Sequence, residues 1–217
     1  MTFYRFARTV VVGVCRVAFR VRVVGTEHVP PSGAYIIAPT HRSNLDTPFT
    51  AFVTTRRIRF MAKQEMFKHP LGAKFITALG GVPVERGSPN ARAALKATRA
   101  ALTSGEPVAM FPEGTRRHGR EVSDLFDGTA YLAVKLGVPI LPVGFGGSEE
   151  ILASGKKIPK LRRVAVVVGQ PIMPPTDATT RKRSDLIAIT TQLQVELQKL
   201  FDEAMLLAGY TPDPPTP

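Results

Sequence analysis

The sequence holds few of the residues from which metal sites and disulfides are built. Cys15 is the only cysteine among 217 residues, which excludes an intrachain disulfide and a metal cage made of cysteines. The four histidines are scattered, and no pair has the spacing of a zinc-binding helix. We therefore expect no metal ion, and nothing in the chain requires an oxidising compartment.

Long hydrophobic runs are missing as well. No uninterrupted apolar stretch approaches the ~18 residues that a membrane-spanning helix needs, and the nearest candidate, residues 10–15, ends at Arg16. The N-terminus also differs from a signal peptide, because Arg16, Arg20 and Arg22 interrupt its apolar part and no small-residue cleavage site follows. These absences predict a cytoplasmic protein that is soluble or lies on a membrane surface.

Acidic residues are scarce: 17 Asp and Glu stand against 29 Lys and Arg, for a net charge of +12. A chain this basic favours an anionic partner, such as nucleic acid, an acidic membrane or a phosphorylated substrate. Tryptophan is absent and aromatic residues make up only 7%, so basic and aromatic residues do not alternate as base stacking requires. A nucleic-acid-binding domain remains as an alternative that salt-dependent retention on DNA, compared with binding to acidic vesicles, would distinguish.

Residues 1–20 predict an amphipathic helix that associates with a membrane surface. On a helical wheel of about 100° per residue, four arginines share one arc, namely Arg5, Arg8, Arg16 and Arg20. Apolar residues gather on the far side, namely Phe3, Val10, Val14, Val17 and Ala18. Such helices lie in the interface, where each basic residue near an acidic leaflet contributes about 1 kcal/mol. The alternative is a helix that only packs on the domain and leaves its arginines solvated.

From residue 21 onward, short strands alternate with helices. The predicted strands are 21–24, 35–39, 58–62, 82–85, 107–111, 139–144 and 164–169. The predicted helices are about 47–55, 71–79, 88–103, 128–136 and 184–208. This alternation predicts one α/β domain over residues 21–209, with a mixed, largely parallel sheet flanked by helices. Residues 210–217 form a proline-rich tail that we expect to be disordered.

Four chemically capable side chains each follow a predicted strand: His41, Lys63, Arg86 and Glu113. Ligands of α/β sheets bind in the crevice beyond the carboxyl ends of the strands. We therefore expect these four side chains to face one crevice, where the cations would hold a phosphate. The alternative for an isolated basic residue is a solvated charge.

His41 and Asp46 form a candidate acid–base pair. Imidazole is well suited to accept a proton near neutral pH, and a carboxylate can hold its other nitrogen in the correct tautomer. A regular helix would place the two about 140° apart, so the chain must turn between them. The alternative is that Asp46 only caps the following helix, because Ser43-x-x-Asp46 is also a capping signal.

Residues 111–116, Phe-Pro-Glu-Gly-Thr-Arg, come directly after a predicted strand. Gly114 permits close approach of the backbone to a ligand, and the amides around it could face an oxyanion. Arg116 offers a planar fork for phosphate, and Glu113 could position Arg116 or a substrate hydroxyl. The alternative is a tight turn with a surface ion pair.

Taken together, these segments resemble the glycerolipid acyltransferase superfamily, and within it the 1-acylglycerol-3-phosphate acyltransferase (PlsC-like) group. Four family motifs occur in order: Asn-His-x4-Asp at residues 40–46, Gly-x4-Arg at 81–86, Phe-Pro-Glu-Gly-Thr-Arg-Ser at 111–117 and Val-Pro-Ile-x-Pro-Val at 138–143. Residues 62–66 resemble the family's Ala-Lys-x-Glu-Leu stretch. Thr40 replaces the usual Asn and Arg117 the usual Ser, and neither change removes a group that proton transfer needs.

The resemblance implies an enzyme that moves a fatty acyl group from acyl-CoA, or from acyl carrier protein, to the free hydroxyl of 1-acylglycerol 3-phosphate (lysophosphatidic acid), giving phosphatidic acid for phospholipid biosynthesis. His41, held by Asp46, would deprotonate the hydroxyl that attacks the thioester. The implied substrate-binding residues are Lys63, Arg86, Glu113, Gly114, Thr115 and Arg116. No metal or bound cofactor is implied, and the enzyme would work at the cytoplasmic face of the cell membrane as a peripheral or monotopic protein.

Other readings remain open on the sequence alone. The acceptor could be glycerol 3-phosphate or another lysophospholipid, and the sequence does not distinguish the two acyl donors. A serine hydrolase is disfavoured, because the Gly-x-Ser-x-Gly elbow is absent around Ser148. A catalytically silent lipid-binding protein is disfavoured by the intact His41 and Asp46. An apolar acyl tunnel is expected, although the sequence does not separate its walls from the core.

Overall fold

Apolar runs of the sequence form one seven-stranded sheet in the computed structural model of this chain, which describes residues 2–84, 91–152, 158–175 and 183–211. The strands are β1 (Arg22–Val24), β2 (Ile36–Pro39), β3 (Arg59–Lys63), β4 (Gly81–Val84), β5 (Val108–Ala109), β6 (Ile140–Gly146) and β7 (Ala165–Val168). Their order across the sheet is β1-β7-β6-β2-β5-β3-β4. All neighbouring strands pair in parallel except β6 and β7, which are antiparallel. The predicted mixed, largely parallel sheet is therefore confirmed.

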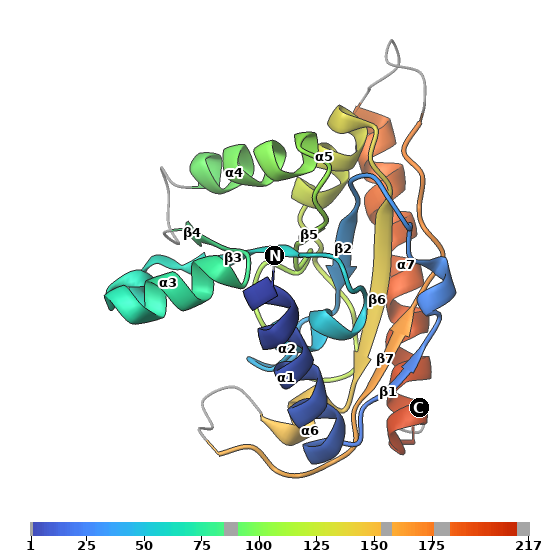
Figure 1. The fold of residues 1–217 in the computed structure, drawn as a ribbon. Coiled ribbons are helices and arrows are strands. Elements are labelled where there is room, and N and C mark those ends of the chain that lie inside the picture. The colour runs from blue at the N-terminus through green and yellow to red at the C-terminus, as the bar shows by residue number, and fades with distance from the viewer. Residues whose placement is uncertain (1, 85–90, 153–157, 176–182, 212–217) are drawn as a thin grey trace.

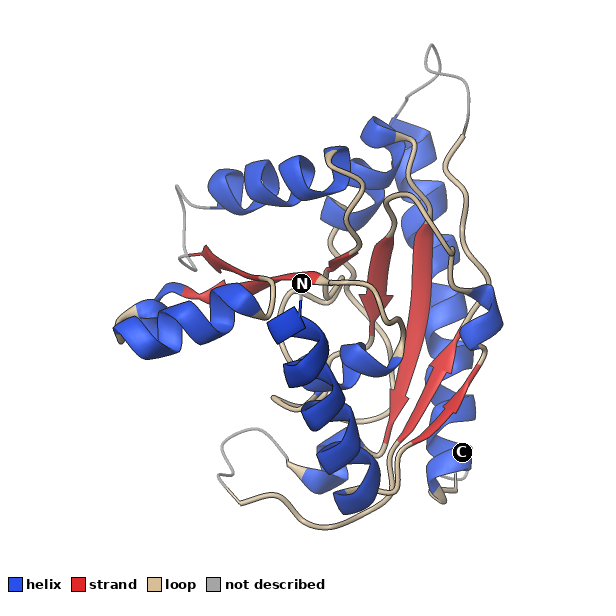
Figure 2. Ribbon diagram, in the orientation of Figure 1, coloured by secondary structure: helices blue, strands red, loops and turns tan. Residues whose placement is uncertain are grey.

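Helices cover both faces of this sheet (Figure 1). The helices of the described residues are α1 (Thr2–Ala18), α2 (Asp46–Phe49), α3 (Pro70–Ala78), α4 (Ala91–Thr103), α5 (Gly128–Leu136), α6 (Ser148–Ile151) and α7 (Arg183–Ala208). Single 3-10 turns are η1 (Thr26–His28), η2 (Thr50–Phe52) and η3 (Gln64–Phe67). The long α7 runs behind β6 and β7, whereas α1 and α2 lie on the opposite face (Figure 2). Of the three buried apolar clusters in the described residues, one lies on the side of α1 and α2 and two lie on the side of α7.

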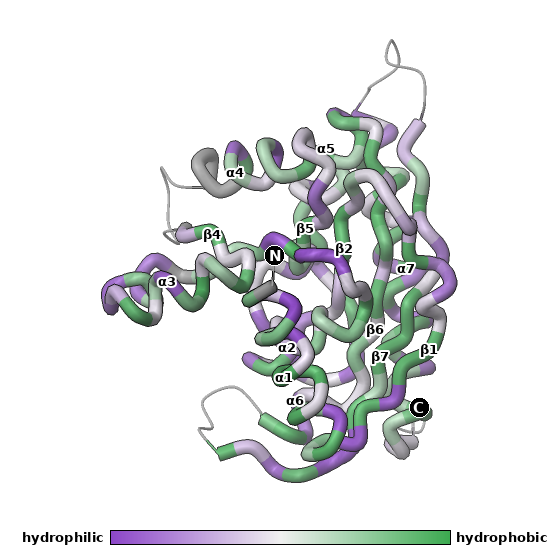
Figure 3. Tube along the Cα trace, viewed as in Figure 1, coloured by the Kyte–Doolittle hydropathy of each residue, from purple (hydrophilic) through white to green (hydrophobic). Residues whose placement is uncertain are grey.

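The two central strands β2 and β6 are buried along their whole length. Strands that are covered by helices on both faces are apolar throughout rather than alternating, and Figure 3 shows β6 and β7 in the green of hydrophobic residues. Because β2 pairs with β6 on one side and β5 on the other, the chain that leaves β2 has ordered neighbours on both sides. This central position holds the segment that follows, residues 40–46.

Helix α1 packs on the domain by a face that the helical wheel did not single out. Ala7 and Cys15 are buried, and the Tyr4 hydroxyl donates to the Arg56 carbonyl at 3.1 Å. The large apolar residues Phe3, Phe6, Val10, Val14 and Val17 are exposed, from 45% for Val10 to 81% for Val17. The helix therefore has a packed face, an arginine-bearing face and a largely exposed apolar face, on which the Phe3 ring meets the edge of Phe75. Across the described residues, none of the helices combines the length and apolar character that crossing a bilayer requires.

Several predicted boundaries shift in the structure. The helix predicted over 47–55 is the short α2 followed by η2, and the strand predicted over 107–111 is reduced to the two residues of β5. The short α6 was not predicted. The predicted helix start at Ser88 lies outside the described residues, as do Arg86 and residues 212–217. Tyr210 packs against the core, and its amide donates to the Met205 carbonyl at 2.9 Å.

Close packing of α7 on β6 depends on two glycines of the strand. A Cβ atom at Gly144 would collide with the Leu200 carbonyl, and one at Gly146 would collide with the backbone of Ala204. Changing Gly144 or Gly146 to Ala should therefore lower the free energy of unfolding by about 1–3 kcal/mol, since added atoms in a packed core force backbone shifts. Chemical denaturation would measure this loss. Gly128→Ala is the matched control, because nothing lies within 4 Å of its added Cβ; equal stability of all three variants would contradict the packing argument.

Candidate active site

The site begins where the chain leaves the carboxyl end of β2. The Thr40 amide donates to the Val143 carbonyl at 3.0 Å, and the Phe145 amide donates to the Thr40 hydroxyl at 3.0 Å. Thr40 is fully buried, so this hydroxyl satisfies a strand amide of β6 in the core. The threonine at the position where the family usually has Asn thus fastens the segment to the neighbouring strand.

His41 and Asp46 meet, as predicted, because the chain turns between them. The His41 Nδ1 lies 2.9 Å from the Asp46 Oδ2. The same carboxylate oxygen accepts the amides of Arg42 and Ser43, each at 2.6 Å. Asp46 therefore closes the turn that comes before α2 and binds the imidazole with one oxygen, whereas the helix itself has no side-chain cap. The hydrogen bond places the proton on Nδ1, which leaves the Nε2 lone pair free to accept a proton.

The His41 ring lines a cavity of about 540 Å³. The ring stacks on Phe111 with its centroid 4.0 Å away, and 8% of the residue is exposed. Most of the cavity wall is apolar. Many of its apolar residues come from the segments around β3 and α3, including Ile58, Phe60 and Ile76. Helix α1 supplies a further part of the wall, and Arg116 lines the same cavity as His41. The structure thus identifies an apolar space beside the imidazole, while the expected acyl tunnel stays a prediction.

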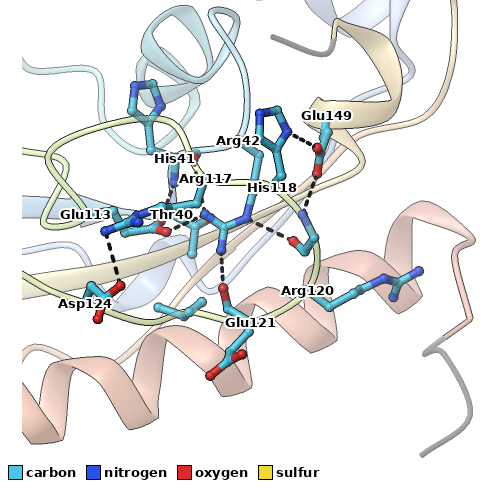
Figure 4. Close-up of polar contacts among 12 residues, drawn as sticks. Thr40, His41, Arg42, Glu113, Arg117, His118, Arg120, Glu121, Asp124 and Glu149 are labelled. Carbon is cyan, nitrogen blue, oxygen red and sulfur yellow. Dashed lines mark hydrogen bonds and ion pairs between the residues drawn. The ribbon is translucent and has the colours of Figure 1, made fainter. Parts of the chain in front are cut away.

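Glu113 has a different partner from the one predicted. Its carboxylate is fully buried and binds the guanidinium of Arg42 rather than that of Arg116, while its Oε1 accepts the backbone amide of His41 at 2.8 Å (Figure 4). Burial raises the pKa of Glu113 above its ordinary value, and the positive charge of Arg42 opposes that rise. Glu113 therefore binds the backbone of His41 and the side chain of Arg42 instead of reaching toward a substrate hydroxyl.

Gly114 and Thr115 form the tight turn that follows Glu113. Gly114 has a φ of 65°, and a side chain there would collide with the Phe126 ring. Its amide donates to the Phe111 carbonyl at 3.0 Å, and the Thr115 amide donates to the Glu113 carbonyl at 2.7 Å. Both amides thus already donate within the turn. Their role in stabilising an oxyanion stays a prediction. The turn directs Arg116 to the cavity that His41 also lines.

The other two predicted cations are only partly placed. Lys63 is the last residue of β3, at the same sheet edge as His41, but its side chain lies outside the described atoms. Arg86 is outside the described residues altogether. His41 and Arg116 are therefore the pair of predicted functional side chains that the structure brings to one cavity.

Sequence reasoning missed two contributors to the site. Arg42 is buried next to His41 and pairs with Glu113, although its residue type suggests an exposed position. Arg8 of α1 lines the cavity, and its Nε donates to the Thr54 carbonyl at 2.9 Å. No pattern along the chain identifies either residue, because their partners are distant in sequence. The described part of the chain contains no cluster of three or more His, Cys, Asp or Glu side chains that could hold a metal ion.

Comparison with known proteins finds relatives that share one activity name. The chain is 26% identical over 198 residues to the 1-acyl-sn-glycerol-3-phosphate acyltransferase of Bacillus subtilis (strain 168), covering 91% of this chain and 96% of that protein. It is 26% identical over 186 residues to the human 1-acyl-sn-glycerol-3-phosphate acyltransferase alpha, covering 85% and 64%. It spans about half, 54%, of a relative of the same activity name from Chlamydomonas reinhardtii.

The fold also matches a solved structure. The crystal structure of the 1-acyl-sn-glycerophosphate (LPA) acyltransferase PlsC from Thermotoga maritima superposes with a TM-score of 0.75 at 24% identity, covering 96% of this chain and 83% of that one. At this identity the match concerns the fold alone. A sequence profile of the acyltransferase family matches residues 20–146, which is more than half of the chain. The protein therefore belongs to the acyltransferase family and is an enzyme that transfers acyl groups.

Proposed function

We propose that this enzyme transfers a fatty acyl group to the free hydroxyl of lysophosphatidic acid and forms phosphatidic acid. The observation that carries the proposal is the His41–Asp46 pair at the wall of an apolar cavity that Arg116 also lines. An imidazole base, an apolar space and a phosphate-binding cation are the three elements that such a substrate needs. Relatives that carry this activity name, one of them matched over 96% of its length, support the acceptor.

The proposed reaction begins with the acceptor hydroxyl donating to the Nε2 of His41. Asp46 holds Nδ1, keeps the ring in the tautomer with a free Nε2, and stabilises the imidazolium that forms. As the proton moves to Nε2, the acceptor oxygen attacks the thioester carbonyl. The carbon–sulfur bond then breaks, and the carrier sulfur takes the proton from the imidazolium and leaves as a thiol. No acyl-enzyme is needed. The acid–base step contributes roughly 10²–10⁴-fold to the rate, and positioning of the two substrates contributes much of the remainder.

The phosphate and acyl ends of the substrates have separate sites in this proposal. Arg116, together with Lys63 and Arg86, holds the acceptor phosphate, and Gly114 and Thr115 shape the turn that presents Arg116. The apolar cavity wall around Phe60 receives a hydrocarbon chain. The donor is a thioester of coenzyme A or of acyl carrier protein, and no bound cofactor or metal takes part.

A donor-by-acceptor matrix tests the proposed activity directly. Purified protein is incubated with acyl-CoA or acyl carrier protein and with lysophosphatidic acid, glycerol 3-phosphate or other lysophospholipids, and the products are identified by mass spectrometry. We expect phosphatidic acid from lysophosphatidic acid. Transfer only to another acceptor would replace the proposed substrate, and release of free fatty acid without any acceptor would indicate a hydrolase.

Removal of the proton acceptor should abolish most turnover. His41→Ala is expected to lower kcat by roughly 10²–10⁴-fold, because it removes the group that takes the hydroxyl proton in the proposed reaction. Asp46→Asn should also lower kcat, since it removes the charge that stabilises the imidazolium. Steady-state kinetics measure both effects, with His69→Ala, at an exposed histidine before α3, as the control. Near-normal turnover of a folded His41→Ala variant would refute the assignment of the base.

Loss of a clamp arginine should act on binding of the acceptor. Arg116→Ala and Arg86→Ala are each expected to raise the KM for lysophosphatidic acid about 10- to 100-fold, which corresponds to the ~1.5–3 kcal/mol of a hydrogen bond to a charged group. Arg99→Ala, at an exposed arginine of α4, is the control. If KM and kcat/KM for the acceptor stay unchanged in both variants, the phosphate is bound elsewhere.

We further propose that α1 holds the enzyme peripherally on the cytoplasmic face of the membrane. Its exposed apolar side chains would enter the acyl boundary, and arginines such as Arg5 and Arg16 would lie among anionic headgroups. The net charge of +12 favours the same anionic surface. The phospholipid product, which is itself a membrane component, fits this location.

Charges on the apolar face of α1 should weaken membrane association. The double variant Phe6→Glu/Val14→Glu is expected to reduce co-sedimentation with phosphatidylglycerol-containing vesicles at least about tenfold, because burying each large apolar side chain contributes ~1.5–3 kcal/mol. The matched control is Ile187→Glu/Val195→Glu on α7, where both residues are similarly exposed, at 53% and 63%. Equal co-sedimentation of the two double variants would contradict a specific role of α1.

A further inference from the structure

Arg42 is a deeply buried arginine beside the site, with 1% of the residue exposed. Its guanidinium donates to the Glu113 carboxylate, to the His41 carbonyl at 3.1 Å, to the Gly119 carbonyl at 3.2 Å and to the Glu121 carbonyl at 2.9 Å. All three nitrogens of the guanidinium are therefore used, and Figure 4 shows these contacts as a fork. The guanidinium therefore connects His41, which follows β2, to Glu113 and to residues 119–121.

The opposite side of this arginine faces α7. The guanidinium carbon lies 4.9 Å from the centre of the Phe201 ring, over its face. Phe201 is itself buried, with 2% exposed, within the layer that covers the sheet. The arginine is thus fixed between the helix layer and the site, and its own amide donates to Asp46.

These contacts account for nearly all the polar groups of His41. Its amide donates to Glu113, its carbonyl accepts from Arg42 and from the Arg117 amide at 2.9 Å, and its Nδ1 binds Asp46. Within the described part of the chain, Nε2 is the remaining polar group of this histidine and has no hydrogen bond. Figure 4 shows the ring pointing away from the Arg42 guanidinium, so Arg42 acts on the backbone and not on the imidazole.

Stability alone does not explain this arrangement. Desolvation of a buried ion pair offsets much of its attraction, and well-packed apolar residues often replace such a pair without loss of stability. A catalytic base, in contrast, must be held within about 0.5 Å of its productive position. Arg42 and Glu113 together bind the backbone carbonyl and amide of His41, and the position of the imidazole depends on this backbone.

We propose that Arg42 is a positioning residue for acyl transfer: with Glu113 it fixes both backbone polar groups of His41, so that Nε2 faces the acceptor hydroxyl. Arg42 does not touch the substrates in this role. The proposal rests on His41 being the base of the proposed reaction. It predicts a specific loss of turnover, and not of substrate affinity, when the fork is removed.

The variants that test this role are Arg42→Lys, Arg42→Met and the double variant Arg42→Met/Glu113→Gln. Arg42→Met leaves a buried carboxylate without its partner and is expected to unfold more easily. The double variant removes both charges, so it should recover an unfolding temperature close to that of the unsubstituted enzyme. The kcat of the double variant should nevertheless stay about 10- to 100-fold below that of the unsubstituted enzyme, with KM nearly unchanged. The reason is that displacing a catalytic group by ~1 Å can lower the rate about 10²-fold. Arg42→Lys keeps the charge but loses the fork and should give an intermediate kcat.

A second ion pair of the same chemistry serves as the control. Arg59 donates to Glu106 at 2.8 Å, away from the cavity, and the double variant Arg59→Met/Glu106→Gln should keep its kcat. If the Arg42→Met/Glu113→Gln enzyme recovers both stability and kcat, Arg42 has only a structural role and the proposal is overturned. Failure of both the double variant and Arg42→Lys to fold would overturn it in the same way, by assigning Arg42 to stability.

A measurement without substrate separates this proposal from the proposed function. Nitrogen NMR of labelled histidine should report one sharp set of ring-nitrogen signals for His41 in the unsubstituted protein, and signals that are broadened or split by several ring positions in the Arg42→Met/Glu113→Gln protein. Identical His41 signals in the two proteins would contradict the positioning role. If the unsubstituted enzyme transfers nothing to lysophosphatidic acid, the proposed function fails, while the His41 signals still decide the role of Arg42.

Discussion

One carboxylate oxygen determines the geometry of this site. The Oδ2 of Asp46 accepts from the amides of Arg42 and Ser43 and from the imidazole of His41. The backbone turn and the orientation of the ring therefore share an acceptor, and a substitution at Asp46 changes both together. The carboxylate therefore has both of the contacts that the sequence suggested as alternatives: it shapes the chain before α2 and it binds the imidazole of His41. Full burial of Asp46 strengthens these hydrogen bonds, because water does not compete for the oxygen.

The position of β2 in the sheet supplies the remaining support. On one side, β6 binds Thr40 through the Phe145 amide; beyond β6, the Leu152 carbonyl accepts from the hydroxyl of Ser43 at 2.8 Å. On the other side, the segment after β5 brings Glu113 under the His41 amide. Crossover connections of a parallel sheet thus bring together residues more than seventy positions apart. A loop that follows a central strand can be held from both sides, and the loop that carries His41 therefore has hydrogen bonds to both neighbouring segments.

The sequence is sufficient for the fold class, which follows from strand and helix periodicity. It also leads to the contact between His41 and Asp46, although through the four ordered family motifs, since the five-residue spacing alone fits a helix cap equally well. It is insufficient for Arg42 and for the partner of Glu113. Residue type predicts that an arginine is exposed, and the carbonyls and carboxylate that satisfy Arg42 belong to residues 41 and 113–121, most of them far along the chain. For α1, the helical wheel separates an arginine face from an apolar face, but it does not show that the packed face lies between them. Which face packs depends on the distant carbonyls that Tyr4 and Arg8 contact.

Those contacts of α1 connect the site with the proposed membrane surface. Tyr4 and Arg8 bond to the carbonyls of Arg56 and Thr54, and the same two side chains line the cavity of His41. The exposed apolar stripe of Phe6, Val10 and Val14 lies on another face of the same helix. A rigid helix fixes the angle between its faces, so a helix that rests on a bilayer by this stripe also fixes the orientation of the cavity relative to the lipid. If α1 lies in the membrane as proposed, the two polar contacts would do more than attach it to the domain: they would couple the depth of the helix in the membrane to the position of the cavity wall beside His41.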